Sequence, residues 1–267
     1  MARIERLRVY PVKGFDGVGV EESRVTGAGT LAGDREWALC PPDAPPVVER
    51  GDAVEWAING KQSEQIHTVE TSFDPPATLT VDGESYDVGD APGRAAAGEA
   101  LTAGLDVDGP LELRRRDPPG FVDRPDAGPT VVSSATLREV ASWFDDHGLS
   151  AAAVRRRLRV NVEVSGVPAF WEDRFVGEDA PVFRAGGVEF VGVESCARCV
   201  VPSRDPDTGE PLPEFRERFA ERRGATFPDF ADRDAVPHDY TLTLVAGVAS
   251  GGGETVRVGD EVTTGHS

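Results

Sequence analysis

The apolar residues of this chain occur in short segments separated by turn residues, which favours strands over long helices. Polar and apolar residues alternate from Ile4 to Val12, as expected for a strand with one buried face. Residues 78–81 and 84–88 flank Asp82-Gly83, the signal of a type I′ hairpin turn. Further strands are predicted at residues 158–164, 182–183, 188–193, 240–246 and 256–262. We therefore expect a mainly β protein with a few helices, of the α+β class.

A few segments carry helical signals instead. Thr136 and Glu139 are spaced as a helix-capping box, and Gly148 is placed to end that helix. The apolar residues expected on its buried face are Leu137, Val140, Ala141 and Phe144. Shorter helices are predicted at residues 95–103, 150–157 and 214–223.

The length of 267 residues allows one large β domain or two of medium size. Residues 106–130 are rich in Asp, Pro and Gly and are typical of a connection between two halves. We therefore predict one domain at residues 1–108 and a second at residues 109–267.

Net charge is −19, from 47 acidic against 28 basic residues. Only two basic residues are lysines, Lys13 and Lys61; the others are arginines. This balance is typical of proteins from cells that hold molar salt, where a Debye length of about 3 Å screens an acidic surface. We expect a halophilic protein, and nucleic acid is not an expected partner because a phosphate backbone requires a basic face.

No apolar run approaches the roughly 18 residues that a membrane-spanning helix needs. The first residues alternate in polarity and lack the apolar core of a secretion signal. The expectation is a cytoplasmic protein without a membrane partner.

Three cysteines are present, and two of them form a Cys196-x-x-Cys199 pair. An odd and low count argues against a disulfide framework. A zinc site would require a second ligand pair, and a thioredoxin-like pair would require a βαβ context that the surrounding residues do not provide. A single reactive or metal-bound thiol and inert cysteines also remain open on spacing alone.

Basic residues gather at a few places in this acidic chain. Lys13 follows the first strand, within Tyr10-Pro11-Val12-Lys13-Gly14, and Arg35 lies in Gly33-Asp34-Arg35-Glu36-Trp37. Four of the five residues 155–159 are arginines, and arginine suits phosphate because its guanidinium donates two parallel hydrogen bonds. Each place could equally be an ordinary surface lysine or ion pair.

Alternation along the predicted strand 158–164 would put three polar side chains on one face. They are Arg157, Arg159 and Asn161. Such a face could form one wall of an anion-binding site.

Several of these motifs, in order, resemble the MOSC family, named for the C-terminal domain of molybdenum cofactor sulfurase. The resemblance is strongest to the branch that includes the mitochondrial amidoxime reducing component, and it covers nearly the whole chain. The most specific match is Arg198-Cys199, six residues before Asp205-Pro206-Asp207-Thr208-Gly209. The other matching segments are Tyr10–Lys13, Asp34-Arg35, Arg159-Val160-Asn161, 169–174 and 258–262.

The resemblance implies a role for each matching residue. Cys199 would be both the catalytic residue and the protein's ligand to molybdenum. Lys13, Arg35 and Arg159 would bind the phosphate of a molybdenum–molybdopterin cofactor. The remaining cofactor contacts implied are Ser133 or Ser134, Asn161 and Arg198. Gly14 and Ala197 depart from the family branch, which has serine at both positions.

The implied fold is a MOSC β-barrel preceded by a smaller N-terminal β-barrel-like domain, with one cofactor in a cleft between them. The implied activity is a molybdenum-dependent oxidoreductase that reduces small N-oxygenated compounds. An external electron donor of the ferredoxin or flavoprotein type would be needed, because no plant-type iron–sulfur cysteine run is present.

Two alternatives to this activity remain. One is a sulfur carrier or sulfurtransferase that bears a persulfide on Cys199, with the outer sulfur supplied by a cysteine desulfurase. The other is a protein that carries the cofactor without catalysis. Pyridoxal phosphate is not expected, because only Lys13 or Lys61 could form the Schiff base and no other feature supports it.

Overall fold

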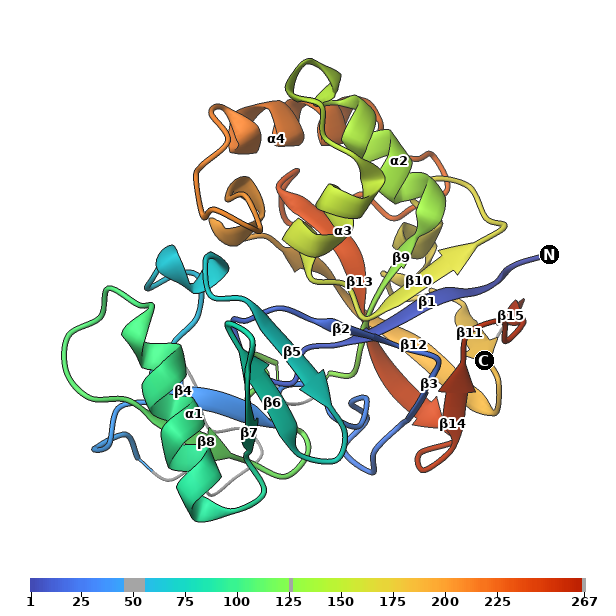
Figure 1. Ribbon diagram of the computed structural model, residues 1–267. Helices are drawn as coiled ribbons and strands as arrows, with labels where there is room; N and C mark the ends of the chain where they lie inside the picture. The colour runs from blue at the N-terminus through green and yellow to red at the C-terminus, as the bar shows by residue number, and fades with distance from the viewer. Residues whose placement is uncertain (46–55, 125–126, 266–267) are drawn as a thin grey trace.

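The computed structural model describes residues 1–45, 56–124 and 127–265. Within these ranges it contains fifteen strands and four α-helices. The strands supply most of the regular structure, which confirms the expected α+β class. In Figure 1 the helix α1 and the short strands near it form one lobe, and helices α2, α3 and α4 gather above the large sheet. No described helix is long and apolar enough to cross a membrane.

The largest sheet has eight strands in the order β15-β11-β12-β13-β9-β10-β1-β2. Its neighbours run antiparallel except β9 and β10, which run parallel. The strand bounds are Arg3–Val9 (β1), Val18–Val20 (β2), Thr130–Ser133 (β9), Val162–Ser165 (β10), Val182–Ala185 (β11), Val188–Ala197 (β12), Thr241–Ser250 (β13) and Val262–Gly265 (β15).

The sheet curls so that β15, at one end, meets the start of β1, which is next to the other end. The backbone of Ile4 in β1 donates to Asp260 O at 2.9 Å, and Val262 in β15 donates to Ala2 O at 2.9 Å. Strand β12 is irregular at three places along its pairing with β13, and such bulges bend a strand. The result is a barrel filled by apolar side chains from most of its strands.

The N-terminal lobe contains two smaller sheets and one helix. Strand β4 (Trp37–Cys40) pairs with β8 (Glu112–Arg115), and β5 (Thr71–Asp74), β6 (Thr78–Val81) and β7 (Glu84–Asp87) form a second sheet beside α1 (Ala91–Ala103). The predicted hairpin is confirmed, because β6 pairs with β7 and both turn residues, Asp82 and Gly83, have positive φ. One apolar core joins these elements.

The first residues of the chain pair with the second half. Strand β1 pairs with β10, and β3 (Glu22–Arg24) pairs with β14 (Thr255–Arg257). The start of the chain therefore belongs to the large barrel by hydrogen bonding, while residues 37–45 and 56–115 contribute to the separate lobe. The division at residues 108 and 109 stays a prediction. Two residues of the expected connection, 125–126, lie outside the described residues.

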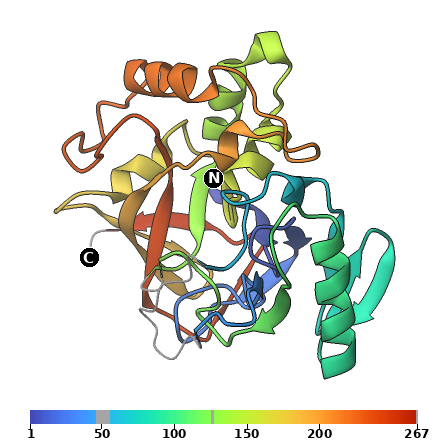
Figure 2. The ribbon, with the colours of Figure 1, turned by 90° about the vertical axis from the view of Figure 1, so that its left-hand side faces the viewer.

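Three helices cover one end of the barrel, as Figure 2 also shows. They are α2 (Ser134–Ser142), α3 (Ala151–Leu158) and α4 (Phe215–Ala225), and they share one apolar core. The short helix η3 (Trp171–Phe175) packs Trp171 and Phe175 into the barrel core instead. The predicted cap of α2 is shifted: Ser133 is the N-cap, and its hydroxyl accepts a 2.9 Å hydrogen bond from Thr136 N. Thr136 is therefore inside the helix.

Two predicted strands were wrong in extent. Helix α3 continues to Leu158, Arg159 follows in the left-handed region with a φ of 52°, and β10 begins only at Val162. The arginine-rich run suits the last turn of a helix, where cations interact favourably with exposed carbonyls. The predicted strand 256–262 is two strands, β14 and β15, separated by a turn at Gly259, where φ is 92°.

Candidate functional site

A cleft of about 270 Å³ lies where the N-terminal lobe meets the barrel. Its walls come from the segment after β1, the loop before β9, the end of α3 and the loop after β12. The cleft therefore depends on segments that are more than a hundred residues apart in the chain.

The lining of this cleft is strongly basic. Among its described residues seven are cationic and one, Asp123, is acidic. The cations are Lys13, Arg35, Lys61, Arg124, Arg157, Arg159 and Arg198. Both lysines of the chain are included, although the whole protein carries a net charge of −19. A positive cleft in so acidic a chain favours an anionic ligand.

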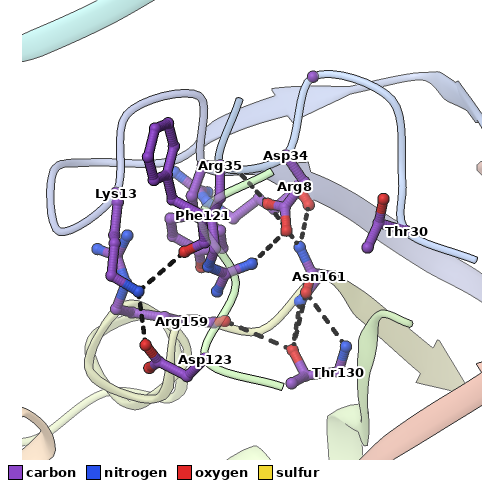
Figure 3. Close-up of polar contacts among 12 residues, drawn as sticks. Arg8, Lys13, Thr30, Asp34, Arg35, Phe121, Asp123, Thr130, Arg159 and Asn161 are labelled. Atoms are coloured by element: carbon purple, nitrogen blue, oxygen red, sulfur yellow. Dashed lines mark hydrogen bonds and ion pairs between the residues drawn. The ribbon is translucent and has the colours of Figure 1, made fainter. Parts of the chain in front are cut away.

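Lys13 is buried, with 4% of its surface exposed. Its Nζ donates to Phe121 O at 2.9 Å and to the carboxylate of Asp123 at 2.5 Å, as Figure 3 shows. Burial lowers the pKa of Lys13, and Asp123 offsets part of that change. The ammonium group is therefore paired with a half-exposed carboxylate of the protein itself.

Arg159 reaches from the end of α3 to the segment that follows Lys13, and it has no carboxylate partner among the described residues. Its Nη1 donates to the carbonyls of Gly14, at 3.2 Å, and Phe15, at 2.7 Å. Its Nη2 is buried and has no hydrogen-bond partner among the described residues. Burial lowers the pKa of Arg159 to about 10. A buried cation with a spare N–H is the chemistry of an anion site.

Arg35 and Arg159 both stack near one aromatic ring. Their guanidinium carbons lie 5.2 Å and 4.2 Å from the centre of the Tyr10 ring. Arg35 adopts a left-handed φ of 55° and bonds to the neighbouring carboxylate of Asp34. The ring of Tyr10 thus helps to hold two cations near each other, which their repulsion would otherwise oppose.

Asn161 is engaged on both sides of its amide (Figure 3). Its Nδ2 donates to Arg8 O at 3.1 Å and to Asp34 Oδ1 at 3.0 Å. Its Oδ1 accepts from the backbone N and the hydroxyl of Thr130, each at 3.1 Å. Asn161 lines the cleft, and its polar atoms join the N-terminal segment to β9.

Cys199 lies in the loop after β12 and is partly exposed to the cleft. Cys196 is buried on β12, and both thiols are free. Within the described residues there is no group of three or more His, Cys, Asp or Glu side chains that could hold a metal ion. The two cysteines are therefore not part of a protein-only metal cluster in that part of the chain.

Arg198, between the two cysteines, turns its guanidinium toward the barrel. It donates to Leu242 O and to the Thr243 hydroxyl on β13, and to Leu158 O at 3.2 Å at the end of α3. Its donors are therefore used in anchoring the cysteine segment.

Protein-family models match almost the whole length of the chain. The MOSC N-terminal β-barrel domain matches residues 1–106, and the MOSC domain matches residues 124–263. The chain belongs to the MOSC family.

Two further comparisons give individual proteins to which this MOSC protein is similar. It is 27% identical over 240 residues to the zebrafish (Danio rerio) protein named mitochondrial amidoxime-reducing component 1, a match that covers 77% of this chain and 70% of that protein. The crystal structure of the YuaD protein from Bacillus subtilis aligns over 100% of this chain and 97% of its own, with 12% identity and a TM-score of 0.42.

The MOSC protein brings together most of the residues that its sequence singled out. Six of them line the cleft: Lys13, Arg35, Arg159, Asn161, Arg198 and Cys199. Ser133 and Ser134 do not. The Ser133 hydroxyl donates to Pro168 O and caps α2, and the Ser134 hydroxyl donates to Glu163. Both hydroxyls therefore form hydrogen bonds that hold the start of α2 in place.

Sequence reasoning missed other residues of the cleft. Lys61 lines it, and its rarity as one of two lysines is the signal that could have found it. Asp123 and Arg124 lie in the segment that was interpreted only as a connection. His67 packs behind Gly60, and burial lowers its pKa to about 4, so its imidazole is neutral near pH 7.

Proposed function

We propose that this MOSC protein binds a molybdenum–pterin cofactor in the cleft and acts as an oxidoreductase on small N-oxygenated compounds. The observation that carries the proposal is the meeting of the Cys199 thiol with Lys13 and Arg159 in one cleft. The name of the zebrafish relative supports the substrate class, since an amidoxime is an N-hydroxylated amidine.

The residues of the cleft fit such a cofactor. A thiolate is a suitable ligand for a soft metal, and Cys199 is the partly exposed cysteine of the cleft. The spare Nη2 of Arg159 is a buried donor that a phosphate oxygen would satisfy. A volume of about 270 Å³ is near the lower end of small-molecule sites, which span roughly 300–1,000 Å³.

The protein's own residues would bind, orient and shield the cofactor. Lys13, Arg35 and Arg159 neutralise the phosphate, and Asn161 and Arg198 keep the surrounding backbone in place. Cys199 supplies the thiolate. When bound, the cofactor supplies two-electron chemistry at its metal.

Reduction of an N-hydroxyl group consumes two electrons and two protons and releases water. The chain has three cysteines and no iron–sulfur run, so the electrons would come from a separate donor of the ferredoxin or flavoprotein type. The protons would come from solvent that enters at the open side of the cleft.

The test is molybdenum content and amidoxime reduction, measured on the wild type, Cys199→Ser and Cys196→Ser proteins purified in high salt. We expect Cys199→Ser to lose molybdenum or turnover while its circular dichroism stays unchanged. Cys196→Ser should keep both, because one protein thiolate suffices. The reverse pattern would show that the ligand assignment is wrong.

Cyanide-releasable sulfur, measured on the same samples, separates the alternatives. A protein without molybdenum that releases sulfur from Cys199 would be a sulfur carrier served by a cysteine desulfurase. A protein that holds molybdenum but reduces no N-oxygenated compound would be a cofactor carrier.

A further inference from the structure

The loop that carries Cys199 is held by arginines from α3. Arg157, in the last turn of that helix, has only 4% of its side chain exposed. Its Nη1 donates to Pro202 O at 3.3 Å and to Arg204 O, and its Nη2 donates to Asp205 Oδ2 at 3.2 Å. The guanidinium of Arg157 therefore donates hydrogen bonds to three residues of the loop.

The loop is shaped to receive this contact. Asp205 Oδ1 accepts from the backbone N of Asp207 at 3.0 Å and of Thr208 at 3.2 Å, which closes a tight turn. The other oxygen of the same carboxylate is left for Arg157. Arg156 extends the contact by donating to Pro206 O at 3.2 Å and to Asp207 Oδ1 at 2.7 Å.

The end of α3 also places the anion-binding side of the cleft. Arg159, two residues after Arg157, directs its guanidinium to the carbonyls of Gly14 and Phe15. The end of α3 thus contacts both the loop that carries Cys199 and the segment that contains Gly14 and Phe15. Any shift of the loop against α3 changes the position of Cys199 relative to Arg159.

We propose that Arg157 is a positioning residue: through the fork that it makes with Asp205 and two loop carbonyls, it sets where the Cys199 thiol stands in the cleft. This inference rests on the proposed function, in which Cys199 is the metal ligand. A lysine cannot replace the fork, because its ammonium lacks the planar set of donors.

The test uses the full chain and the rate at which iodoacetamide alkylates each cysteine, resolved by peptide mass spectrometry. We expect Arg157→Lys to raise the Cys199 rate about tenfold, since a loop that loses charge-assisted bonds opens more often. Cys40 is buried in another apolar cluster, away from the cleft, and reports global unfolding. Its alkylation rate should stay unchanged.

Arg155→Lys is the matched control. Arg155 lies on the same helix and its fork binds Glu163, which is buried, without contacting the loop. This variant should lower the melting temperature while leaving the Cys199 rate within about twofold of the wild type. Equal Cys199 rates in Arg157→Lys and Arg155→Lys would overturn the proposal.

Asp205→Asn keeps the test decisive if Arg157→Lys does not fold. Asparagine retains the oxygen that closes the turn and loses the acceptor that faces Arg157, so the Cys199 rate should rise and the fold should persist. An unchanged Cys199 alkylation rate contradicts the proposal.

The Mo(V) EPR signal of the loaded protein gives a second readout, which should shift in Asp205→Asn and stay the same in Arg155→Lys. If Cys199→Ser kept its molybdenum, the proposed function would fail, yet the alkylation rates would still decide the role of Arg157.

Discussion

Lys13 is buried and Arg159 is partly buried, and the two cations differ in their partners. Lys13 has a carboxylate partner, Asp123, whereas Arg159 has only carbonyl oxygens and an N–H that is left over. Lys13, Lys61 and Arg35 all act on the Asp123 carboxylate and hold its pKa below its usual range, although burial alone would raise it. Asp123 thus occupies the place in the cleft where an external anion would meet the same cations.

We expect Asp123→Asn to bind inorganic phosphate more tightly than the wild type. Asparagine removes the anion that competes for Lys13, and the freed ammonium gains a charge-assisted contact with phosphate. Because the Asp123 side chain is about half exposed, the gain should be modest, roughly threefold to tenfold in Kd. Titration calorimetry at constant ionic strength measures it.

Asp117→Asn controls for the loss of one negative charge. Its side chain lies in the same loop, is 89% exposed and does not line the cleft. If both variants bound phosphate equally well, the gain would be a general charge effect and Asp123 would not compete with the ligand.

At the scale of elements, the short helix η3 inserts two acidic side chains between α2 and α4. Glu172 Oε2 accepts from Ser133 N at 3.2 Å, at the start of α2, and its other oxygen has no hydrogen-bond partner among the described residues. Asp173 pairs at 2.6 Å with Arg223, which is fully buried. Burial, helped by the neighbouring Asp173, raises the pKa of Glu172 well above its ordinary value of 4.5.

This raised pKa predicts a pH dependence of stability. At a pH between its pKa in the unfolded chain and its pKa in the folded protein, Glu172 binds a proton only in the folded state. Its contribution to the free energy of unfolding is therefore full below pH 4.5 and is lost as the pH rises through the pKa of the folded protein. Glu172→Gln mimics the protonated side chain, so this variant should not lose stability as the pH rises. Its free energy of unfolding should exceed that of the wild type by at least about 1 kcal/mol at pH 9 and by little near pH 5.

Urea denaturation of both proteins across that range, at constant salt, measures the difference. Glu139→Gln is a suitable control, because the Glu139 side chain is only partly buried and its carboxylate accepts from the Trp143 ring N–H, away from Glu172. A difference between Glu172→Gln and wild type that did not change with pH would show that Glu172 is ionised in the folded protein.

At the scale of the whole molecule, an acidic exterior surrounds a basic cleft. The net charge of −19 opposes the compact state, and the separation of charge draws anions toward the cations of the cleft. Salt affects the exposed acidic surface and the cations of the cleft differently. It screens repulsion over the exposed surface strongly, and it screens the buried Lys13 and Arg159 much less.

We expect the melting temperature to rise with salt between about 0.1 M and 1 M, where the Debye length shortens from about 10 Å to about 3 Å. Each kcal/mol gained should raise it by roughly 2–4 °C for a chain of this size. Differential scanning calorimetry in a potassium chloride series measures the change, and sucrose at matched osmolality separates screening from general solute exclusion. A melting temperature independent of salt would contradict the halophilic interpretation.

Local patterns were sufficient for much of the secondary structure. The Asp82-Gly83 turn was predictable because glycine and aspartate tolerate positive φ, and α4 was predictable from its charged helical run. The helix predicted at residues 150–157 was confirmed by α3, but the strand was predicted to begin at residue 158, four residues before β10 does. Arg159 ends the helix in the left-handed region, and its guanidinium docks against the carbonyls of Gly14 and Phe15, which a local sequence pattern does not reveal.

For the site, the sequence was enough to single out unusual residues: Cys199 in its motif, a lysine at position 13 and arginines at positions 35 and 159. The folded structure was needed to show that they share one cleft, that Asp123 pairs with Lys13 and that the Asn161 amide is already used by the protein. These contacts could not be predicted because the residues lie far apart along the chain. Contacts such as that of Arg159 with Phe15 join residues 144 positions apart, and the pairing of β1 with β10 helps to bring these parts of the chain together.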